Sequence, residues 1–272
     1  MVSPAHPEHH KPLQGVRIVV TRAPEDAAPL LRRLAELGAT ALSLPAVQIA
    51  PPEDCAPLDA ALQALESYDW IVFASRHAVI AVFERMSQTG LEAKLPPGPR
   101  VATVGEATAR SLRERCGSES LVSPVPTADG LAAVLLAEGM NGKRVLIPVS
   151  DLSRATLPAR LSASGAAVDT VTAYRTVPPI HTDTQVLEQL RAGQVEVVTF
   201  ASPSAVHNVV EILGEDPAPL QVARLVCIGP TTADALRAVG LVPAAVARLP
   251  TIDGLLDAIL NACSFLSGTP DP

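Results

Sequence analysis

The chain alternates short apolar runs with stretches in which apolar residues recur every three or four positions. The short runs are rich in Val and Ile and lack polar alternation, as is typical of strands covered on both faces. They predict strands at residues 16–20, 40–44, 70–73, 101–104, 121–122, 145–147, 167–172, 197–200, 225–228 and 244–246. The helical spacing between them predicts helices at 24–37, 57–66, 76–88, 106–115, 127–137, 155–162, 183–191, 204–213, 232–238 and 251–260. Strands that alternate with helices imply parallel sheets with helices on both faces, and hence an α/β fold.

The pattern occurs twice along the chain. Phe73-Ala74-Ser75 and Phe200-Ala201-Ser202 each follow an apolar run, and they lie 127 positions apart. At the same offset, many other residues are identical between Gly15–Pro52 and Gly142–Pro179. After a loss of three loop residues the identities resume, and Asp129-Gly130-Leu131 matches Asp253-Gly254-Leu255. Identities in register predict a tandem duplication of a unit of roughly 125 residues.

Two extended, proline-bounded segments, 45–52 and 174–179, are predicted to connect domains. If the chain crosses at both, residues 14–48 and 177–262 form one discontinuous domain, and residues 49–176 form the other. Each is expected to be a flavodoxin-like parallel-sheet domain of about five strands. The polar segment 1–13 is expected to be a disordered tail in which His9 and His10 bind no physiological metal, and 263–272 a loose tail.

Composition narrows the function classes. The net charge of −7 argues against nucleic acid or an anionic membrane as a partner, so an anionic ligand requires a local site. The four cysteines show no Cys-x-x-Cys spacing, which favours reduced thiols and a cytoplasmic location. No apolar run is long enough to span a membrane, and the first 13 residues lack a signal-peptide core.

Candidate site residues follow the predicted strands. Ligands of doubly wound sheets lie beyond the carboxyl ends of the strands, where helices also begin and offer free backbone N–H groups. Neither Gly105 nor Gly229 belongs to a dinucleotide or P-loop motif. The candidates for substrate binding are Thr21, Arg22, Ser75, Arg76, His77, Gly105, Thr108, Ser150, Ser202, Pro203, Ser204, Gly229, Thr231 and Thr232.

Six short motifs, in the same order, resemble the uroporphyrinogen-III synthase family over nearly the whole chain. They are Val20-Thr21-Arg22, Tyr68-Asp69-Trp70-Ile71-Val72-Phe73-Ala74-Ser75, Val104-Gly105-Glu106-Ala107-Thr108-Ala109, Ala173-Tyr174-Arg175-Thr176, Phe200-Ala201-Ser202-Pro203-Ser204 and Ile228-Gly229-Pro230-Thr231-Thr232-Ala233-Asp234-Ala235-Leu236. The resemblance implies two α/β domains joined by paired connectors. It also implies cyclisation of hydroxymethylbilane, a linear tetrapyrrole with eight carboxylates, to uroporphyrinogen III, with loss of water and inversion of the last ring. No cofactor or metal is implied.

The resemblance also bears on individual residues. The family's motif includes Tyr174, which we interpret as a catalytic phenol, although an aromatic that packs at the connector is the alternative. Ser75 and Ser202 are helix caps or ligand contacts, and Thr108 and Thr232 are helix-start hydroxyls or carboxylate contacts. Arg76-His77 departs from the family, whose members usually carry a small residue or Asn at the second position. These two residues are carboxylate ligands or an exposed helix start.

Two other function classes stay open at this point. A non-enzymatic, two-lobed cytoplasmic sensor of small anions or tetrapyrroles fits the same fold, and the departure at Arg76-His77 is consistent with it. A nucleotide-binding transferase fits less well, because the chain lacks a glycine-rich phosphate loop. For the synthase we expect a monomer without nucleic-acid or membrane partners, which receives its substrate from hydroxymethylbilane synthase.

Overall fold

The computed structural model describes residues 11–264 of the chain, and its contacts divide the chain into two compact units. The terminal unit comprises Met1–Gln48 and Val177–Pro272, and the middle unit comprises Ile49–Thr176. The chain passes from one unit to the other within two strands, β3 (Gln48–Ala50) and β8 (Ala167–Val177).

The terminal unit contains a parallel sheet of five strands in the order β11-β10-β9-β1-β2. Its central strands β1 and β9 pair in register through Ile18↔Val197, Val19↔Val198 and Val20↔Thr199. Within residues 11–48 and 177–264 the elements are β1 (Arg17–Val20), α1 (Pro24–Glu36), β2 (Thr40–Ser43), α7 (Thr184–Arg191), β9 (Val197–Phe200), α8 (Pro203–Ile212), α9 (Ala218–Gln221), β10 (Arg224–Cys227), α10 (Pro230–Ala238), β11 (Pro243–Val246) and α11 (Ile252–Cys263).

The middle unit contains a sheet in the order β3-β8-β7-β4-β5-β6, and its core strands are parallel. Strand β7 pairs with β4 on one side and with β8 on the other. The elements of this unit, besides β3 and β8, are α2 (Ala56–Gln63), the 3-10 turn η1 (Leu65–Ser67), β4 (Trp70–Phe73), α3 (Arg76–Gln88), β5 (Arg100–Thr103), α4 (Glu106–Cys116), β6 (Leu121–Val122), α5 (Ala128–Ala137), β7 (Arg144–Ser150) and α6 (Thr156–Ala163).

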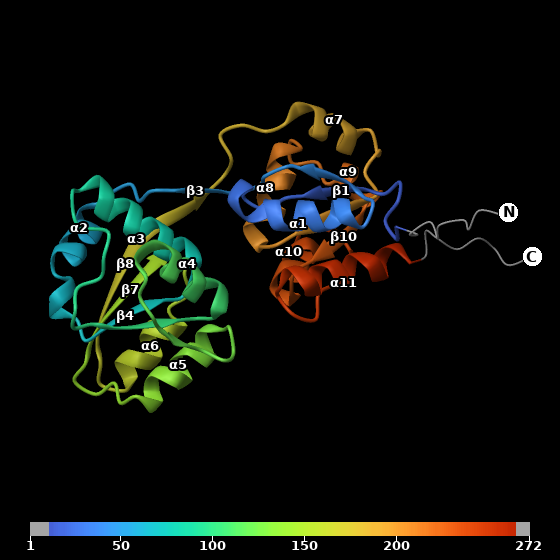
Figure 1. The fold of residues 1–272 in the computed structure, drawn as a ribbon. Helices are drawn as coiled ribbons and strands as arrows, with labels where there is room; N and C mark the ends of the chain where they lie inside the picture. The colour runs from blue at the N-terminus through green and yellow to red at the C-terminus, as the bar shows by residue number, and fades with distance from the viewer. Residues whose placement is uncertain (1–10, 265–272) are drawn as a thin grey trace, which may run out of the picture. The chain divides into compact units, whose positions relative to one another are not determined.

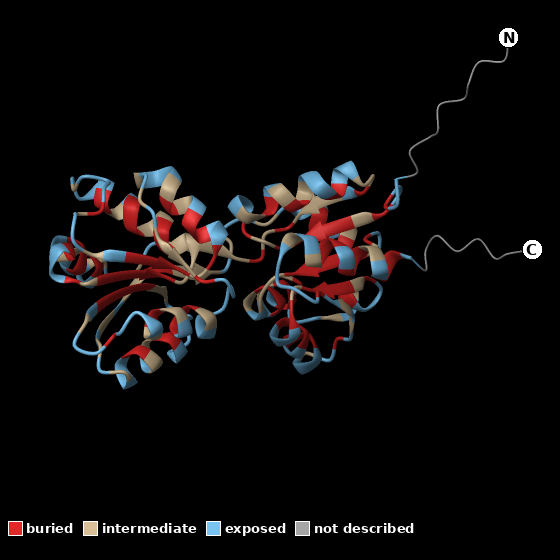
Figure 2. Cartoon of the chain, turned by 60° about the horizontal axis from the view of Figure 1, so that its bottom comes forward, coloured by how far each residue is buried: buried red, intermediate tan, exposed pale blue. Residues whose placement is uncertain are grey.

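Helices cover both faces of each sheet (Figure 1). In the terminal unit, α1 and α11 pack on one face, and α7, α8, α9 and α10 pack on the other. In the middle unit, α2, α3 and α4 cover one face, and α5 and α6 cover the other. The strands β1, β4, β9 and β10, inside the sheets, are therefore mostly buried, while the helices alternate buried and exposed residues (Figure 2). This two-sided burial accounts for the unbroken apolar runs in the sequence.

The structure corrects the predicted tails and connectors. Leu13 is completely buried and its N–H bonds to the Leu37 carbonyl, so the ordered fold begins before residue 14; residues 1–10 lie outside the described residues. Cys263 is also buried, in the last turn of α11, and it does not belong to a loose tail; residues 265–272 are not described. The second predicted connector continues β8 as far as Val177: Tyr174 still pairs with Ser150 of β7, and β8 also borders β3 at the edge of the sheet.

Smaller differences concern element ends. The first predicted connector contains the short strand β3, and β7 extends to Ser150, three residues beyond the prediction. The short helix α9 follows Pro217 and was not predicted, since four residues are too few to show a helical period. Thr127 and Thr251 cap α5 and α11 by accepting the N–H groups of Gly130 and Gly254. For Thr127 this confirms the predicted cap.

Tyr68 stabilises the amino-terminal edge of the middle sheet. Its ring is 5% exposed and its hydroxyl donates to Asp169 at 2.9 Å. The Arg144 guanidinium lies 4.5 Å from the ring centroid and also bonds to Asp169 at 2.9 Å. Burial, followed by the hydrogen bond to Asp169, raises the pKa of Tyr68 to about 12. The phenol thus stays protonated and stabilises the fold at neutral pH.

Tyr68→Phe is expected to lower the free energy of unfolding by about 1 kcal/mol at pH 7, since one half-exposed hydrogen bond to a carboxylate is lost. Because the folded-state pKa of about 12 exceeds the unfolded value, the hydroxyl's contribution is complete below about pH 10 and is lost as pH rises toward 12. Urea unfolding at pH 7 and across pH 9–12 measures both effects. An identical pH slope in wild type and variant would contradict the prediction.

Candidate active site

Tyr174 and Ser75 meet at the carboxyl end of the middle sheet, at its topological switch point. Chain connections lead from β4 toward β5 and from β7 toward β8, so the direction of winding reverses between the neighbouring strands β4 and β7. Ser75 follows β4, Ser150 ends β7, and Tyr174 pairs with Ser150 on β8. Ligands of doubly wound sheets bind outside the carboxyl ends of the strands at such a reversal.

The Tyr174 hydroxyl contacts a helix cap. It donates to Ser75 Oγ at 3.2 Å, and the same oxygen accepts the N–H of His77 at 3.1 Å at the start of α3. The imidazole of His77 lies 5.7 Å from the Tyr174 ring, measured between centroids. Ser75, Arg76 and His77 are all partly exposed, so the first turn of α3 presents polar groups beside the phenol. The sequence candidates of this corner are therefore brought together.

A second network supports Tyr174 from β7. Ser150 Oγ donates to Asp151 Oδ1 at 2.9 Å, and that carboxylate oxygen accepts the N–H of Thr176 at 3.0 Å. The N–H of Asp151 in turn bonds to the carbonyl of Tyr174 at 3.2 Å. The sequence analysis missed Asp151. Its position in the loop directly after the candidate Ser150 was the available signal, because binding and catalytic residues are disproportionately found on loops.

The protonation state of Tyr174 follows from its surroundings. The residue is 8% exposed, and burial is the main cause that raises the pKa of its phenol. The hydrogen bond with Ser75 opposes this shift, while the Asp151 carboxylate adds to it. A phenol with a raised pKa remains protonated at neutral pH. It can therefore donate a hydrogen bond to a ligand oxygen, but it is a poor general base.

The terminal unit has an equivalent switch point between β1 and β9. The chain runs from β1 to β2 on one side and from β9 to β10 on the other. Arg22 follows β1, and Ser202 follows β9 and caps α8 by accepting the N–H of Ala205 at 3.2 Å. Thr21 is completely buried and donates to the Thr199 carbonyl at 2.7 Å, so its hydroxyl joins the two strands.

The remaining candidates lie at helix starts of the two units. Gly105 and Gly229 precede α4 and α10 in extended backbone conformations, without a side-chain cap. Thr108 and Thr232 are buried at 4% and 1% exposure, which favours the interpretation as helix-start residues. Thr231 is exposed beside Thr232, and Pro203 and Ser204 begin α8. These helix starts leave backbone N–H groups available for anionic groups.

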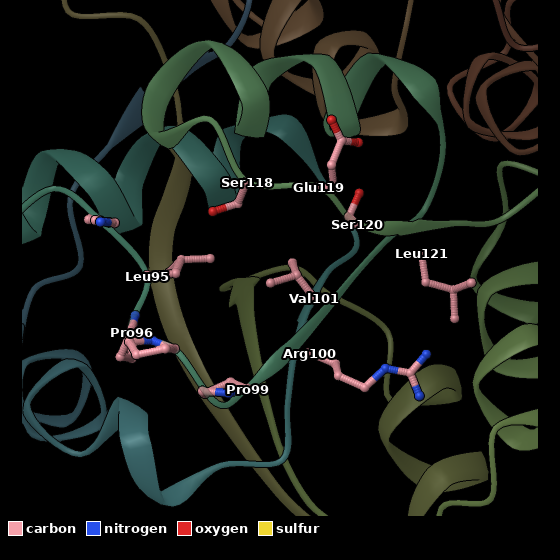
Figure 3. Close-up of a pocket in the computed structure, with 11 residues that line it drawn as sticks. Leu95, Pro96, Pro99, Arg100, Val101, Ser118, Glu119, Ser120 and Leu121 are labelled. Atoms are coloured by element: carbon pink, nitrogen blue, oxygen red, sulfur yellow. The ribbon is translucent and has the colours of Figure 1, made fainter.

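A hollow of about 550 Å³ lies elsewhere in the middle unit (Figure 3). Its walls are the proline-rich segment that leads into β5 and the segment that leads into β6, including Leu95, Arg100, Val101 and Leu121. Since Arg100 and Leu121 are the first residues of their strands, this hollow lies at the amino-terminal edge of the sheet. It is therefore distinct from the edge that carries Tyr174.

Two searches of the described residues bear on other classes of site. Within residues 11–264, no group of three or more His, Cys, Asp or Glu side chains is arranged to hold a metal ion. Over the same part of the chain, the helices are too short or too polar to cross a membrane.

Comparison with known proteins gives a consistent result. The model of the family "Uroporphyrinogen-III synthase HemD" matches residues 28–257. A uroporphyrinogen-III synthase of Synechococcus elongatus is 30% identical over 256 residues, which cover 92% of this chain and 96% of that protein. Porphyrin biosynthesis protein HemD of Ruminiclostridium josui is 28% identical over 252 residues, and the chain spans 49% of its length.

Solved structures agree on the fold. A uroporphyrinogen III synthase of the extremely thermophilic bacterium Thermus thermophilus superposes with a TM-score of 0.59 at 19% identity, covering 92% of this chain and 100% of that one. For uroporphyrinogen-III synthetase of Helicobacter pylori 26695 the TM-score is 0.58 at 16% identity, covering 90% and 99%.

Parallel sheets with helices on both faces define the chain as an α/β protein, a class that binds ligands outside the carboxyl ends of its strands. The sequence matches narrow the assignment from a fold class to one family. The chain belongs to the uroporphyrinogen-III synthase family, which places it among the enzymes of tetrapyrrole biosynthesis. This confirms the resemblance drawn from the six motifs.

Proposed function

We propose that the chain converts hydroxymethylbilane to uroporphyrinogen III and water, with Tyr174 as the residue that assists departure of the hydroxyl. The observation that carries the proposal is the buried Tyr174 phenol, bonded to the Ser75 cap at the switch point of the middle sheet. Family membership supports the reaction. Protein groups suffice for the proposed steps, so no cofactor enters the scheme.

The first step breaks the C–O bond of the hydroxymethyl group. Hydrogen-bond donation from Tyr174 stabilises the departing oxygen, and the adjacent pyrrole loses its N–H proton, so that water leaves and an azafulvene remains. The phenol would exchange its bond with Ser75 for one with the substrate. Burial keeps the proton on Tyr174 at neutral pH, which suits a donor.

Ring inversion is then mainly a matter of geometry. The substituted α-carbon of the last ring attacks the azafulvene methylene to give a spiro intermediate, which fragments and recloses at the free position with loss of a proton. The bilane closes in water without inversion, so the protein must favour the conformation in which the substituted carbon attacks. Helix starts capped by Ser75, Gly105, Ser202 and Gly229 supply backbone N–H groups that can hold the carboxylates.

Product isomer analysis tests the proposed reaction. Hydroxymethylbilane is generated in situ with and without the protein, and the oxidised porphyrins are separated by chromatography. We expect predominantly isomer III with the protein and isomer I without it. Isomer I alone, formed at the spontaneous rate, would reject the synthase and favour the two-lobed tetrapyrrole or anion sensor.

We also propose that the two units are flavodoxin-like domains that arose by tandem duplication. The order β11-β10-β9-β1-β2 in the terminal unit corresponds to β6-β5-β4-β7-β8 in the middle unit. In this correspondence β1 and β2 occupy the places of β7 and β8. An acidic residue before the central strand bonds the same backbone N–H in each unit: Asp69 bonds Arg144 N, and Glu196 bonds Arg17 N. The strands β3 and β8 then represent the paired extended connectors.

The same proposal covers compartment and partners. Four free cysteines suit a reducing, cytoplasmic compartment, and the acidic charge suits a protein without nucleic-acid or anionic-membrane partners. We propose a monomer that takes up hydroxymethylbilane released by its synthase. Sedimentation equilibrium tests the monomer, since a dimer would double the 28.3 kDa mass.

A further inference from the structure

Arg22 is a partly exposed cation, and one nitrogen of its guanidinium is buried without a hydrogen-bond partner. Of the buried side-chain nitrogen and oxygen atoms in the part of the chain that the structure describes, its Nη1 atom is the one without a hydrogen-bond partner. Burial lowers the pKa of this guanidinium, and no carboxylate within the described residues counters the shift. A buried donor without a partner opposes folding, so its presence calls for a reason other than stability.

The position of Arg22 supplies that reason. It is the second residue after β1 and precedes α1, while the neighbouring strand β9 leads into the Ser202 cap of α8. Helices α1 and α8 pack on opposite faces of the sheet. Arg22 therefore lies at the point where the chain connections from β1 and β9 diverge to opposite faces. This switch point is the place at which parallel α/β sheets bind their ligands.

The middle unit shows that the fold does not require a cation here. Its strand β7 occupies the place of β1, since Arg144 of β7 corresponds to Arg17 of β1. At the same offset of 127 positions, Arg22 corresponds to Val149, an apolar residue packed against the core of that unit. The catalytic candidate Tyr174 lies at the middle unit's switch point, and Arg22 lies at the terminal unit's.

We infer that Arg22 is a specificity residue that pairs with a carboxylate of the tetrapyrrole at the switch point of the terminal unit. The inference rests on the proposed function and adds an ionic contact to the backbone N–H groups of the helix starts. A guanidinium binds a carboxylate through two parallel N–H bonds, which would satisfy the orphaned Nη1. An acidic protein thereby acquires one local cation for a polyanionic ligand.

The test separates ligand binding from stability. Arg22→Met keeps an extended side chain and removes the charge. The Kd for uroporphyrin III, measured by fluorescence quenching, is expected to rise about 10- to 100-fold, as for loss of a charge-assisted hydrogen bond. The Tm of the ligand-free variant is expected to equal or exceed that of wild type, because a buried donor without a partner has been removed. Arg22→Lys is expected to recover part of the affinity.

Arg32→Met is the matched control, since the side chain of Arg32 is 74% exposed on α1 and pairs only weakly with Glu36 at 3.9 Å. It is expected to leave Kd and Tm unchanged. An unchanged Kd in Arg22→Met, or a lowered Tm without a change in Kd, would assign Arg22 to the fold and overturn the inference, as would absence of uroporphyrin binding by wild type. Wild type that binds through Arg22 but yields only isomer I would instead reject the synthase and retain the carboxylate site.

Discussion

Replacing Tyr174 with phenylalanine is expected to lower kcat about 100-fold, the lower end of the effect of a positioned proton or hydrogen-bond donor. KM is expected to change little, because the ring keeps its packing and only the hydroxyl is removed. The physical reason is that the buried phenol stays protonated and donates at the switch point of the middle sheet, where it now bonds Ser75. Steady-state rates of isomer III formation over a range of substrate concentrations give kcat and KM, and single-turnover rates isolate the chemical steps.

Tyr68→Phe is the matched control for this variant. Tyr68 is the chain's other tyrosine, and it is also buried, but it lies at the opposite edge of the same sheet and bonds Asp169. The control should retain wild-type kcat despite its small loss of stability. If Tyr174→Phe also retained kcat, Tyr174 would be an aromatic that packs at the start of the connector, the alternative that the sequence left open.

The α/β class was predictable because a strand that is buried on both faces is an unbroken apolar run in the sequence. Runs such as Trp70–Phe73 and Val197–Phe200 are fully buried, and their predicted bounds agree with β4 and β9. The apolar pattern is weaker where a strand extends beyond the hydrophobic core. Residues 174–177 of β8 include polar side chains and are only partly buried after Tyr174, so they read as a connector, although Tyr174 still pairs with β7 and β8 also borders β3.

The candidate site was predictable in outline, since parallel strands bring their carboxyl ends to one edge of a sheet. That rule selected Ser75 and Ser150, and they lie at one edge of the middle sheet together with Tyr174, which was selected from the family's motif. It did not distinguish a hydroxyl turned inward from one turned outward: Thr21 bonds a neighbouring strand instead of facing the edge. Hydrogen-bond partners depend on three-dimensional packing, which the order of residues does not encode locally.

The two copies of Asp-Gly-Leu place glycines where a side chain does not fit. Gly130 and Gly254 are the third residues of α5 and α11, and their backbone does not require glycine. A Cβ atom would lie 2.3 Å from the Val125 carbonyl oxygen at Gly130, and 2.3 Å from that of Leu249 at Gly254. Those carbonyls are held by the N–H groups of Thr127 and Thr251, each at 2.8 Å, so the loop cannot move without losing the turn before the cap.

Gly130→Ala and Gly254→Ala are each expected to lower the free energy of unfolding by about 1–2 kcal/mol, the cost of overpacking after the gain in helix propensity is subtracted. Chemical denaturation followed by circular dichroism measures the loss. Gly229→Ser is the control, because a Cβ atom there meets nothing within 4 Å and serine suits the cap position. It should remain within about 0.5 kcal/mol of wild type. Equal stability of all three variants would mean that the loops before α5 and α11 yield readily, and that the repeated glycines serve another purpose.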